Sequence, residues 1–122
     1  MKLAYVITCH KNSKQVFRLV NRLNTPGNTI VLHISKTCEP GFYQEMKDGI
    51  KAFNNVFLCK REDGTHNSFG IVKGVINGLH FLFKNNIEFD YVSLISGQDY
   101  PIKSNKDINA FFEKNNGKEF LE

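Results

Sequence analysis

Short, nearly continuous apolar runs alternate along this 122-residue chain with segments whose apolar residues recur every three or four positions. The runs cover residues 2–8, 29–34, 55–59 and 89–95, and β-branched and aromatic side chains are common in them. Runs of this length and composition are typical of strands buried on both faces. The chain is therefore expected to repeat a strand–helix–strand unit.

The intervening segments have the spacing of amphipathic helices. Asn12 or Ser13 is expected to cap the first helix, Gly49 weakens the second, and Ser104 with Asp107 resembles a capping box for the last. The apolar positions expected to face the core are Val16, Leu19, Val20 and Leu23 in the first helix, Phe42, Met46, Ile50 and Phe53 in the second, Phe69, Val72, Ile76, Leu79 and Phe83 in the third, and Ile108, Phe111 and Phe112 in the last.

Repeated strand–helix–strand units with right-handed crossovers produce a parallel sheet covered by helices on both faces. We therefore predict an α/β fold, a Rossmann-like three-layer sandwich with a mostly parallel sheet, built as one domain from residues 1–122. Residues 118–122 are expected to begin a fifth strand. Ligands of such sheets bind at the carboxyl ends of the strands.

Composition excludes few classes of function. A net charge of +4 and a pI of about 9.0 suit an anionic ligand such as a nucleotide, although scattered lysines produce the same values. The three cysteines show no C-x-x-C spacing, which argues against a disulfide framework and a zinc site and fits reduced thiols in a cytoplasm. No apolar run approaches the roughly 20 residues that a membrane-spanning helix needs. We expect a cytoplasmic protein.

Polar side chains follow the first two strands at the edge where a ligand is expected. His10 lies where the next helix begins, and its ring and the free N–H groups of that helix could bind a base or a phosphate. A polar helix entry is the alternative interpretation. His33 lies within a buried strand, where a histidine is more often a satisfied core residue than a ligand contact.

The fourth strand leads into Leu-Ile-Ser-Gly-Gln-Asp-Tyr-Pro-Ile-Lys-Ser, residues 94–104. Gly97 permits a close backbone approach or a positive φ, and Pro101 restricts both itself and Tyr100, so the stretch is stiff. Asp99 could bind sugar hydroxyls, or it could cap the loop internally. Glycine-rich phosphate-binding motifs, G-x-S-x-G, H-E-x-x-H and a D-x-D metal motif do not occur.

Residues 94–104 resemble the motif Leu-Ser-Gly-x-Asp-(Tyr/Phe)-Pro-Ile-x-(Ser/Thr) of the core-2/I-branching β-1,6-N-acetylglucosaminyltransferase family, which includes peptide O-xylosyltransferases. Residues 4–11 and 30–35 are similar to its first two strand motifs, and the resemblance spans nearly the whole chain. It implies the nucleotide-binding half of a GT-A type fold. It also implies an inverting, metal-independent transfer of N-acetylglucosamine or xylose from a UDP-sugar to a glycan or polysaccharide acceptor. No cofactor, metal or nucleic-acid partner is then expected.

The resemblance also implies roles for individual residues. The expected nucleotide-binding residues are Thr8, Cys9, His10, His33, Ser35 and Arg61, and those expected to face the donor sugar or the acceptor are Gln98 and Asp99. The catalytic base is not assigned, because the family's catalytic carboxylate lies beyond the matched part. An enzyme of this kind would act on cell-surface polysaccharide precursors, where its acceptor could bring it to a membrane.

Two departures from the family pattern and a difference in length leave alternatives open. The second motif of the family reads His-x-Asp, whereas Ser35 stands here in place of a carboxylate implicated in nucleotide contact. His66 and Asn67 stand where the family has an aromatic and a small residue. Because family domains are considerably longer, we expect truncation at the carboxyl end. The alternatives are a non-catalytic remnant that binds a sugar nucleotide or a partner, and a basic nucleic-acid binder.

Overall fold

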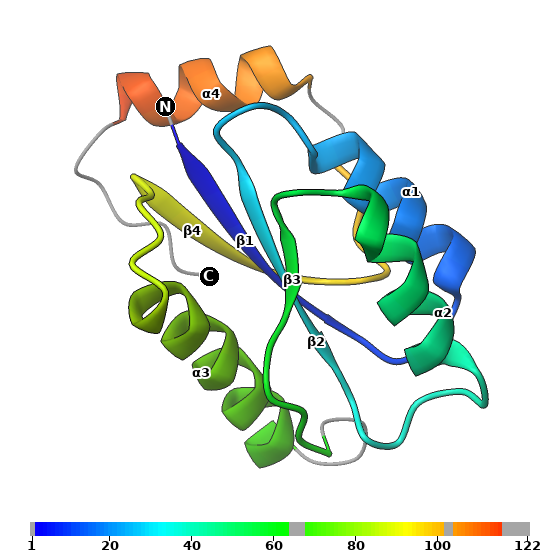
Figure 1. Ribbon diagram of the computed structural model, residues 1–122. Helices are drawn as coiled ribbons and strands as arrows, with labels where there is room; N and C mark the ends of the chain where they lie inside the picture. Colours follow the sequence, from blue (N-terminus) through cyan, green and yellow to red (C-terminus); the bar gives the residue numbers. More distant parts are fainter. Residues whose placement is uncertain (1, 64–67, 102–103, 116–122) are drawn as a thin grey trace.

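The computed structural model describes residues 2–63, 68–101 and 104–115, and Figure 1 shows their arrangement. In chain order the elements are β1 (Leu3–Cys9), α1 (Ser13–Leu23), β2 (Thr29–Ile34), α2 (Phe42–Gly49), the 3-10 helix η1 (Ile50–Ala52), β3 (Val56–Leu58), α3 (Ser68–Lys84), β4 (Tyr91–Ser96) and α4 (Asn105–Lys114). The order of strands and helices is the one that the apolar pattern predicts. The segments of the expected fifth strand and of His66 and Asn67 lie outside the described residues.

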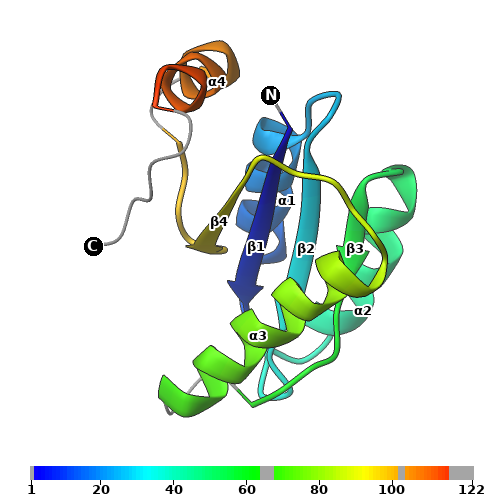
Figure 2. The same ribbon diagram turned by 90° about the vertical axis from the view of Figure 1, so that its left-hand side faces the viewer.

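The four strands pair in the order β3-β2-β1-β4, and every pair is parallel. Helix α3 covers one face of the sheet, whereas α1 and α2 cover the other (Figure 1). Figure 2 shows α4 beyond β4, at the edge of the sheet, and its Ile108 and Phe112 pack on the α1 side. The predicted Rossmann-like α/β arrangement of three layers is therefore confirmed.

The larger core cluster lies between the sheet and helices α1 and α2. The predicted apolar face of α1 is confirmed, because Val16, Leu19, Val20 and Leu23 are all buried. Asn12 is the N-cap residue, with a φ of 60° and no side-chain capping bond. The left-handed backbone there is of the kind that asparagine tolerates better than most residues.

The second and last helices follow the predicted pattern only partly. Helix α2 ends at Gly49, where a Cβ would lie 2.1 Å from the Phe17 ring of α1, and η1 continues the turn as a 3-10 helix. In α4 the Ser104 side chain accepts a hydrogen bond from the Asp107 amide at 3.1 Å, as the capping box predicts. Phe111 was expected to face the core, but it is 50% exposed, and that prediction is wrong.

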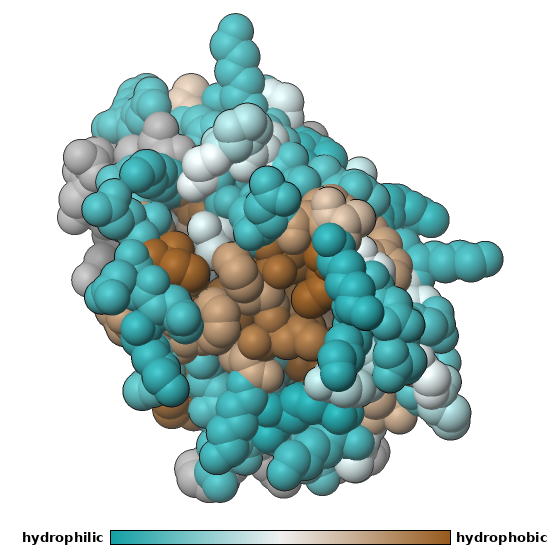
Figure 3. Space-filling model, in the orientation of Figure 1, coloured by the Kyte–Doolittle hydropathy of each residue, from teal (hydrophilic) through white to brown (hydrophobic). Residues whose placement is uncertain are grey.

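Helix α3 turns a different face to the sheet from the one that its apolar spacing predicts. Val72, Ile76 and Phe83 are 49%, 55% and 69% exposed, so their assignment to the core is wrong. Leu79 is partly buried, in agreement with the prediction, and the Phe69 side chain lies outside the described part of the chain. Apolar side chains gather beside α3 and over the sheet on the side of the molecule that Figure 3 shows.

The inner face of α3 is built on glycine. A Cβ on Gly74 would lie 2.6 Å from the His33 ring, and a Cβ on Gly78 would lie 2.4 Å from Val6. These distances leave no room for a side chain, so the backbone of α3 rests directly on β1 and β2. Leu82, one turn beyond Gly78, completes this face and is fully buried.

Candidate functional site

A cavity of about 310 Å³ opens at the carboxyl edge of the sheet. Its lining comes from the ends of three strands and from one helix, and consists of Thr8, Cys9, His10, His33, Ser35, Ile71 and Ser96. Five of the residues that the sequence proposes for nucleotide binding are thus brought together, although they come from two separate strands. A concave site at this edge is where doubly wound sheets bind their ligands.

The strand register explains why these side chains meet. Thr8 of β1 pairs with His33 of β2 on one side and with Ser96 of β4 on the other. Paired residues of adjacent strands point to the same face of a sheet. Two residues earlier in β1 and β2, Val6 and Val31 are buried in the core cluster that also contains Leu82 of α3. The row Thr8–His33–Ser96 therefore lies at one level, on the face that α3 covers.

The His33 ring is held by its neighbours. The ring is 2% exposed, and its Nε2 accepts a hydrogen bond from the Glu62 amide at 2.8 Å. An Nε2 that accepts leaves the ring proton on Nδ1. Burial holds the pKa of His33 below its ordinary value, the charge of Glu62 opposes that shift, and Arg61 adds to it. The neutral ring thus anchors the loop after β3 to the end of β2, which agrees with the core-residue interpretation while the ring still lines the cavity.

Cys9 and Ser35 are buried, as His33 is, whereas the other residues that line the cavity are partly or fully exposed. The Cys9 thiol donates to the His33 carbonyl at 3.7 Å, and burial raises the pKa of Cys9 to about 12. A thiol that stays protonated at neutral pH is a poor nucleophile. The Ser35 hydroxyl lies 3.1 Å from that of Thr37, which in turn donates to an Asp63 carboxylate oxygen at 2.8 Å. Where the family pattern has an aspartate, this chain has Ser35. The Ser35 hydroxyl is linked through the Thr37 hydroxyl to the carboxylate of Asp63.

Arg61 lies beside the cavity without lining it. Its guanidinium donates to the carbonyls of Ile34 and Ser35, at 3.1 and 2.9 Å, and lies 4.0 Å from the centre of the Tyr43 ring. These contacts tie the end of β2 to α2. The guanidinium thus donates its hydrogen bonds to protein carbonyl groups. The proposed nucleotide contact of Arg61 stays a prediction.

The loop after β4 is fixed by its own hydrogen bonds. An Asp99 carboxylate oxygen accepts from the Ser96 amide at 2.8 Å, and the Gln98 amide donates to the Ser96 hydroxyl at 3.2 Å. Neither Gln98 nor Asp99 lines the cavity at the carboxyl edge. Asp99 instead lines a second, more apolar cavity of about 240 Å³ between α1, β4 and α4. Asp99 therefore caps the loop internally, which is one of the two roles that the sequence allows. The proposed contact of Gln98 and Asp99 with the donor sugar or the acceptor stays a prediction.

Gly97 shows why this loop needs a residue without a side chain. A Cβ there would lie 2.8 Å from Cys9 Cβ and 3.0 Å from a methyl group of Val16. Its amide donates to the Thr8 carbonyl at 2.8 Å. Of the two roles that the sequence leaves open, the structure selects close approach, because Gly97 is not among the glycines with positive φ.

Sequence reasoning missed two residues of the cavity. Ser96 is the last residue of β4 and belongs to the motif that drew attention to this loop, so its position at a strand end was a usable signal. Ile71 of α3 gave no such signal, because an apolar residue at helical spacing predicts core. It is 44% exposed and forms the apolar wall of the cavity.

The chemistry of the cavity is that of a binding site. Hydroxyl groups of Thr8, Ser35 and Ser96 and the ring of His10 can donate or accept hydrogen bonds, and Ile71 offers an apolar wall. Among the described residues no carboxylate, lysine or arginine lines it. Within the same residues, no group of three or more His, Cys, Asp or Glu side chains could hold a metal ion. None of the described helices combines the length and the apolar character needed to cross a bilayer.

Parallel α/β sheets covered by helices form a class of proteins that bind ligands at the carboxyl ends of their strands, which is where this cavity opens. The Core-2/I-Branching enzyme family model matches residues 3–122. This chain belongs to that family, and the resemblance seen in its motifs is confirmed.

Curated relatives agree with this membership. A zebrafish (Danio rerio) β-1,3-galactosyl-O-glycosyl-glycoprotein β-1,6-N-acetylglucosaminyltransferase 4 is 31% identical over 121 residues, which is 98% of this chain and 28% of the relative. A human (Homo sapiens) N-acetyllactosaminide β-1,6-N-acetylglucosaminyl-transferase is 28% identical over 117 residues, which is 95% of this chain and 29% of the relative. The chain therefore spans less than a third of the length of these relatives.

Proposed function

We propose that this chain is the donor-binding part of a glycosyltransferase that transfers N-acetylglucosamine from its UDP-sugar to a glycan or polysaccharide acceptor. Family membership supports sugar transfer, and the names of the relatives favour N-acetylglucosamine over xylose. The observation that carries the proposal is the row Thr8–His33–Ser96, at one level of the sheet and opening into one cavity. The proposed setting is the cytoplasm, at a membrane where polysaccharide precursors are built.

The cavity offers what a nucleotide needs. Serine and threonine hydroxyls can pair with the polar edge of a pyrimidine base and with ribose hydroxyls, and Ile71 can pack against a ring. Helix α1 begins at Ser13, close in sequence to His10, and the amino-terminal end of a helix suits an anionic diphosphate. We propose that UDP binds without a metal ion, with its diphosphate directed toward this helix.

The described residues account for binding better than for chemistry. An inverting transfer needs a general base for the acceptor hydroxyl, and it needs positive charge near the leaving diphosphate. No carboxylate lines the cavity among the described residues. This observation favours the second candidate, a non-catalytic domain that binds a sugar nucleotide, as long as no other part of the protein supplies the base.

The proposal is tested by titrating the protein with UDP, UDP-N-acetylglucosamine and UDP-xylose, in the presence of EDTA, and following amide chemical shifts. We expect shifts at Thr8, His33 and Ser96, and tighter binding of UDP-N-acetylglucosamine than of UDP-xylose. Ser96→Ala is expected to weaken UDP binding about three- to tenfold, the effect of one lost hydrogen bond.

Ser93→Ala is the matched control, because Ser93 lies on the same strand but lines the other cavity, beside Tyr5. Shifts confined to other surfaces, or equal UDP affinity for Ser96→Ala and the unchanged protein, would contradict the proposed donor site. Turnover of UDP-N-acetylglucosamine with a glycan acceptor separates the enzyme from the non-catalytic candidate.

A further inference from the structure

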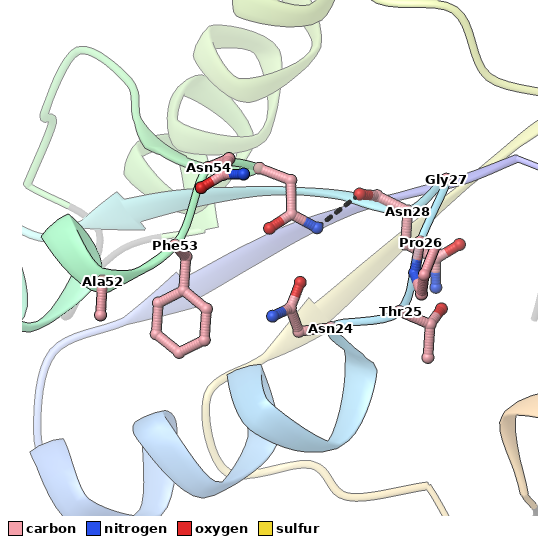
Figure 4. A pocket seen from close by; sticks show the side chains of 9 residues that line it. Asn24, Thr25, Pro26, Gly27, Asn28, Ala52, Phe53 and Asn54 are labelled. Atoms are coloured by element: carbon pink, nitrogen blue, oxygen red, sulfur yellow. Dashed lines mark hydrogen bonds between the residues drawn. The ribbon is translucent and has the colours of Figure 1, made fainter.

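The largest of the cavities described above and here lies at the opposite edge of the sheet, where the strands begin. It has a volume of about 440 Å³ and is walled by the turn before β2 and by the segment between η1 and β3. Figure 4 shows these two walls facing each other. The lining residues are Asn24, Thr25, Pro26, Gly27, Asn28, Ala52, Phe53, Asn54 and Asn55. Nothing in the proposed transfer reaction uses this cavity, because the donor site is at the other end of the strands.

The lining has a distinctive chemistry. None of its side chains carries a charge, although the chain as a whole has a net charge of +4. Four asparagine amides supply its polar character, and Phe53 and Pro26 supply apolar surface. An ionic ligand would find no counter-charge here, and a wholly apolar ligand would leave the amides unsatisfied, which costs free energy. The lining therefore selects for a neutral ligand with many hydroxyl groups.

Two of the asparagines hold the cavity in shape. Asn28 is 4% exposed, and its amide nitrogen donates to the Leu23 carbonyl at 3.1 Å while its oxygen accepts from the Leu3 amide. The Asn55 side chain donates to the Asn28 carbonyl at 2.7 Å and so joins the two walls (Figure 4). The cavity is thus fixed before any ligand arrives, which lowers the entropic cost of binding.

The other two asparagines are available for a ligand. In the part of the chain that the structure describes, no hydrogen bond engages the side-chain amides of Asn24 and Asn54. In Figure 4 the Asn24 side chain extends from the end of α1 into the space beside the Phe53 ring. Phe53 is partly buried and packs one side against the larger core cluster. A fixed aromatic surface next to free amide groups is therefore present.

We propose that this cavity binds a neutral saccharide. An amide offers one acceptor and two donor hydrogens, which matches the paired hydroxyl groups of a sugar ring. The face of an aromatic ring is electron-rich and attracts the polarised C–H groups on the apolar side of a pyranose. The volume falls in the range of about 300–1,000 Å³ that is usual for small-ligand sites. The site lies apart from the donor cavity, so this inference holds whether or not the chain binds UDP.

The test is a titration of the protein with N-acetyllactosamine, lactose and maltose at millimolar concentrations, followed through amide chemical shifts. At least one of the three is expected to shift the amides of residues 24–28 and 52–55. Glucose 6-phosphate is expected not to bind, because the lining carries no cation. Asn24→Ala and Asn54→Ala should each weaken saccharide binding about three- to tenfold, the effect of one hydrogen bond.

Asn21→Ala is the control variant, since Asn21 is an exposed asparagine of α1 outside the cavity. UDP binding is measured on the same proteins and should not change in any variant, so that failure of the donor site and failure of this site are distinguished. No shifts at residues 24–28 and 52–55 with any neutral saccharide would overturn the inference. Equal binding by Asn24→Ala, Asn54→Ala and the unchanged protein would overturn it as well.

Discussion

His33 joins the packing of the molecule to its candidate site. Its ring packs against α3 at Gly74, accepts a hydrogen bond from the Glu62 amide and lines the cavity at the carboxyl edge. The hydrogen bond from the Glu62 amide needs an unprotonated Nε2, and the close contact with α3 needs a fixed ring orientation. Protonation would put a proton on the nitrogen that accepts the Glu62 amide, and it would place a charge in a buried position.

The first prediction concerns the pH dependence of stability. Because the folded pKa of His33 lies below its ordinary value of 6.5, the unfolded chain binds this proton more readily than the folded one. The free energy of unfolding should therefore fall as the pH drops from 6.5 toward 5, with a contribution from His33 of at most about 1.4 kcal/mol per pH unit. Urea unfolding at a series of pH values measures this slope.

His33→Gln is the comparison for this measurement, since its amide oxygen can still accept from the Glu62 amide. The variant should lose less stability between pH 6.5 and 5 than the unchanged protein does. Parallel stability curves for the two proteins would show that His33 is not responsible.

At the scale of single elements, α3 shows how glycine decides which helix face is buried. A helix is expected to bury its most apolar stripe. In α3 the glycine stripe lets the helix approach the sheet at backbone contact with Val6 and His33, and much of the apolar stripe is left exposed. Ile71 reaches the candidate site because of this rotation.

We predict that Gly78→Ala destabilises the protein by about 1–3 kcal/mol, because the new Cβ would overlap Val6. At an ordinary helix position the same substitution stabilises by up to about 1 kcal/mol. The free energy of unfolding in urea distinguishes the two signs.

Val72→Ala, at an exposed position of the same helix, serves as the control and should change stability little. The double variant Val6→Ala with Gly78→Ala should lose less stability than the sum of its single changes, because the smaller residue makes room for the new methyl group. A stabilising effect of Gly78→Ala would disprove the close contact.

At the scale of the whole molecule, the described residues leave two end strands without a second strand partner and one apolar surface exposed. Strands β3 and β4 end the sheet on either side, so each presents unpaired backbone groups among the residues described. Near one edge, Leu94 of β4 is 52% exposed, and α3 exposes Ile76 and Phe83. Exposed apolar surface and unpaired edges both favour association between molecules.

We predict that the 122-residue chain self-associates as its concentration rises and that Ile76→Glu reduces this association. The substitution places a charge in the exposed apolar surface, and its effect on the free energy of unfolding should stay within about 0.5 kcal/mol. Sedimentation velocity over a range of concentrations measures the association. Asn21→Glu adds the same charge on α1 and should leave association unchanged, so equal effects of the two variants would count against this apolar surface.

The apolar runs, the buried face of α1 and the cap of α4 could be predicted because each depends on residues close together in the chain. The meeting of Thr8 with His33 could also be predicted, since parallel strands deliver their carboxyl ends to one edge. Local pattern and backbone chirality are enough for these features, and both are properties of the sequence.

Other features depend on which surfaces come into contact, and the tertiary structure alone decided them. The buried face of α3 follows from how closely its backbone approaches β1 and β2, whereas apolar spacing measures only side-chain area. Arg61 donates to the carbonyls at the end of β2, because Ile34 and Ser35, 27 and 26 positions away in the sequence, came within its reach only after folding. The neutral cavity at the amino edge arises in the same way, from two asparagine-containing segments that only the sheet brings together.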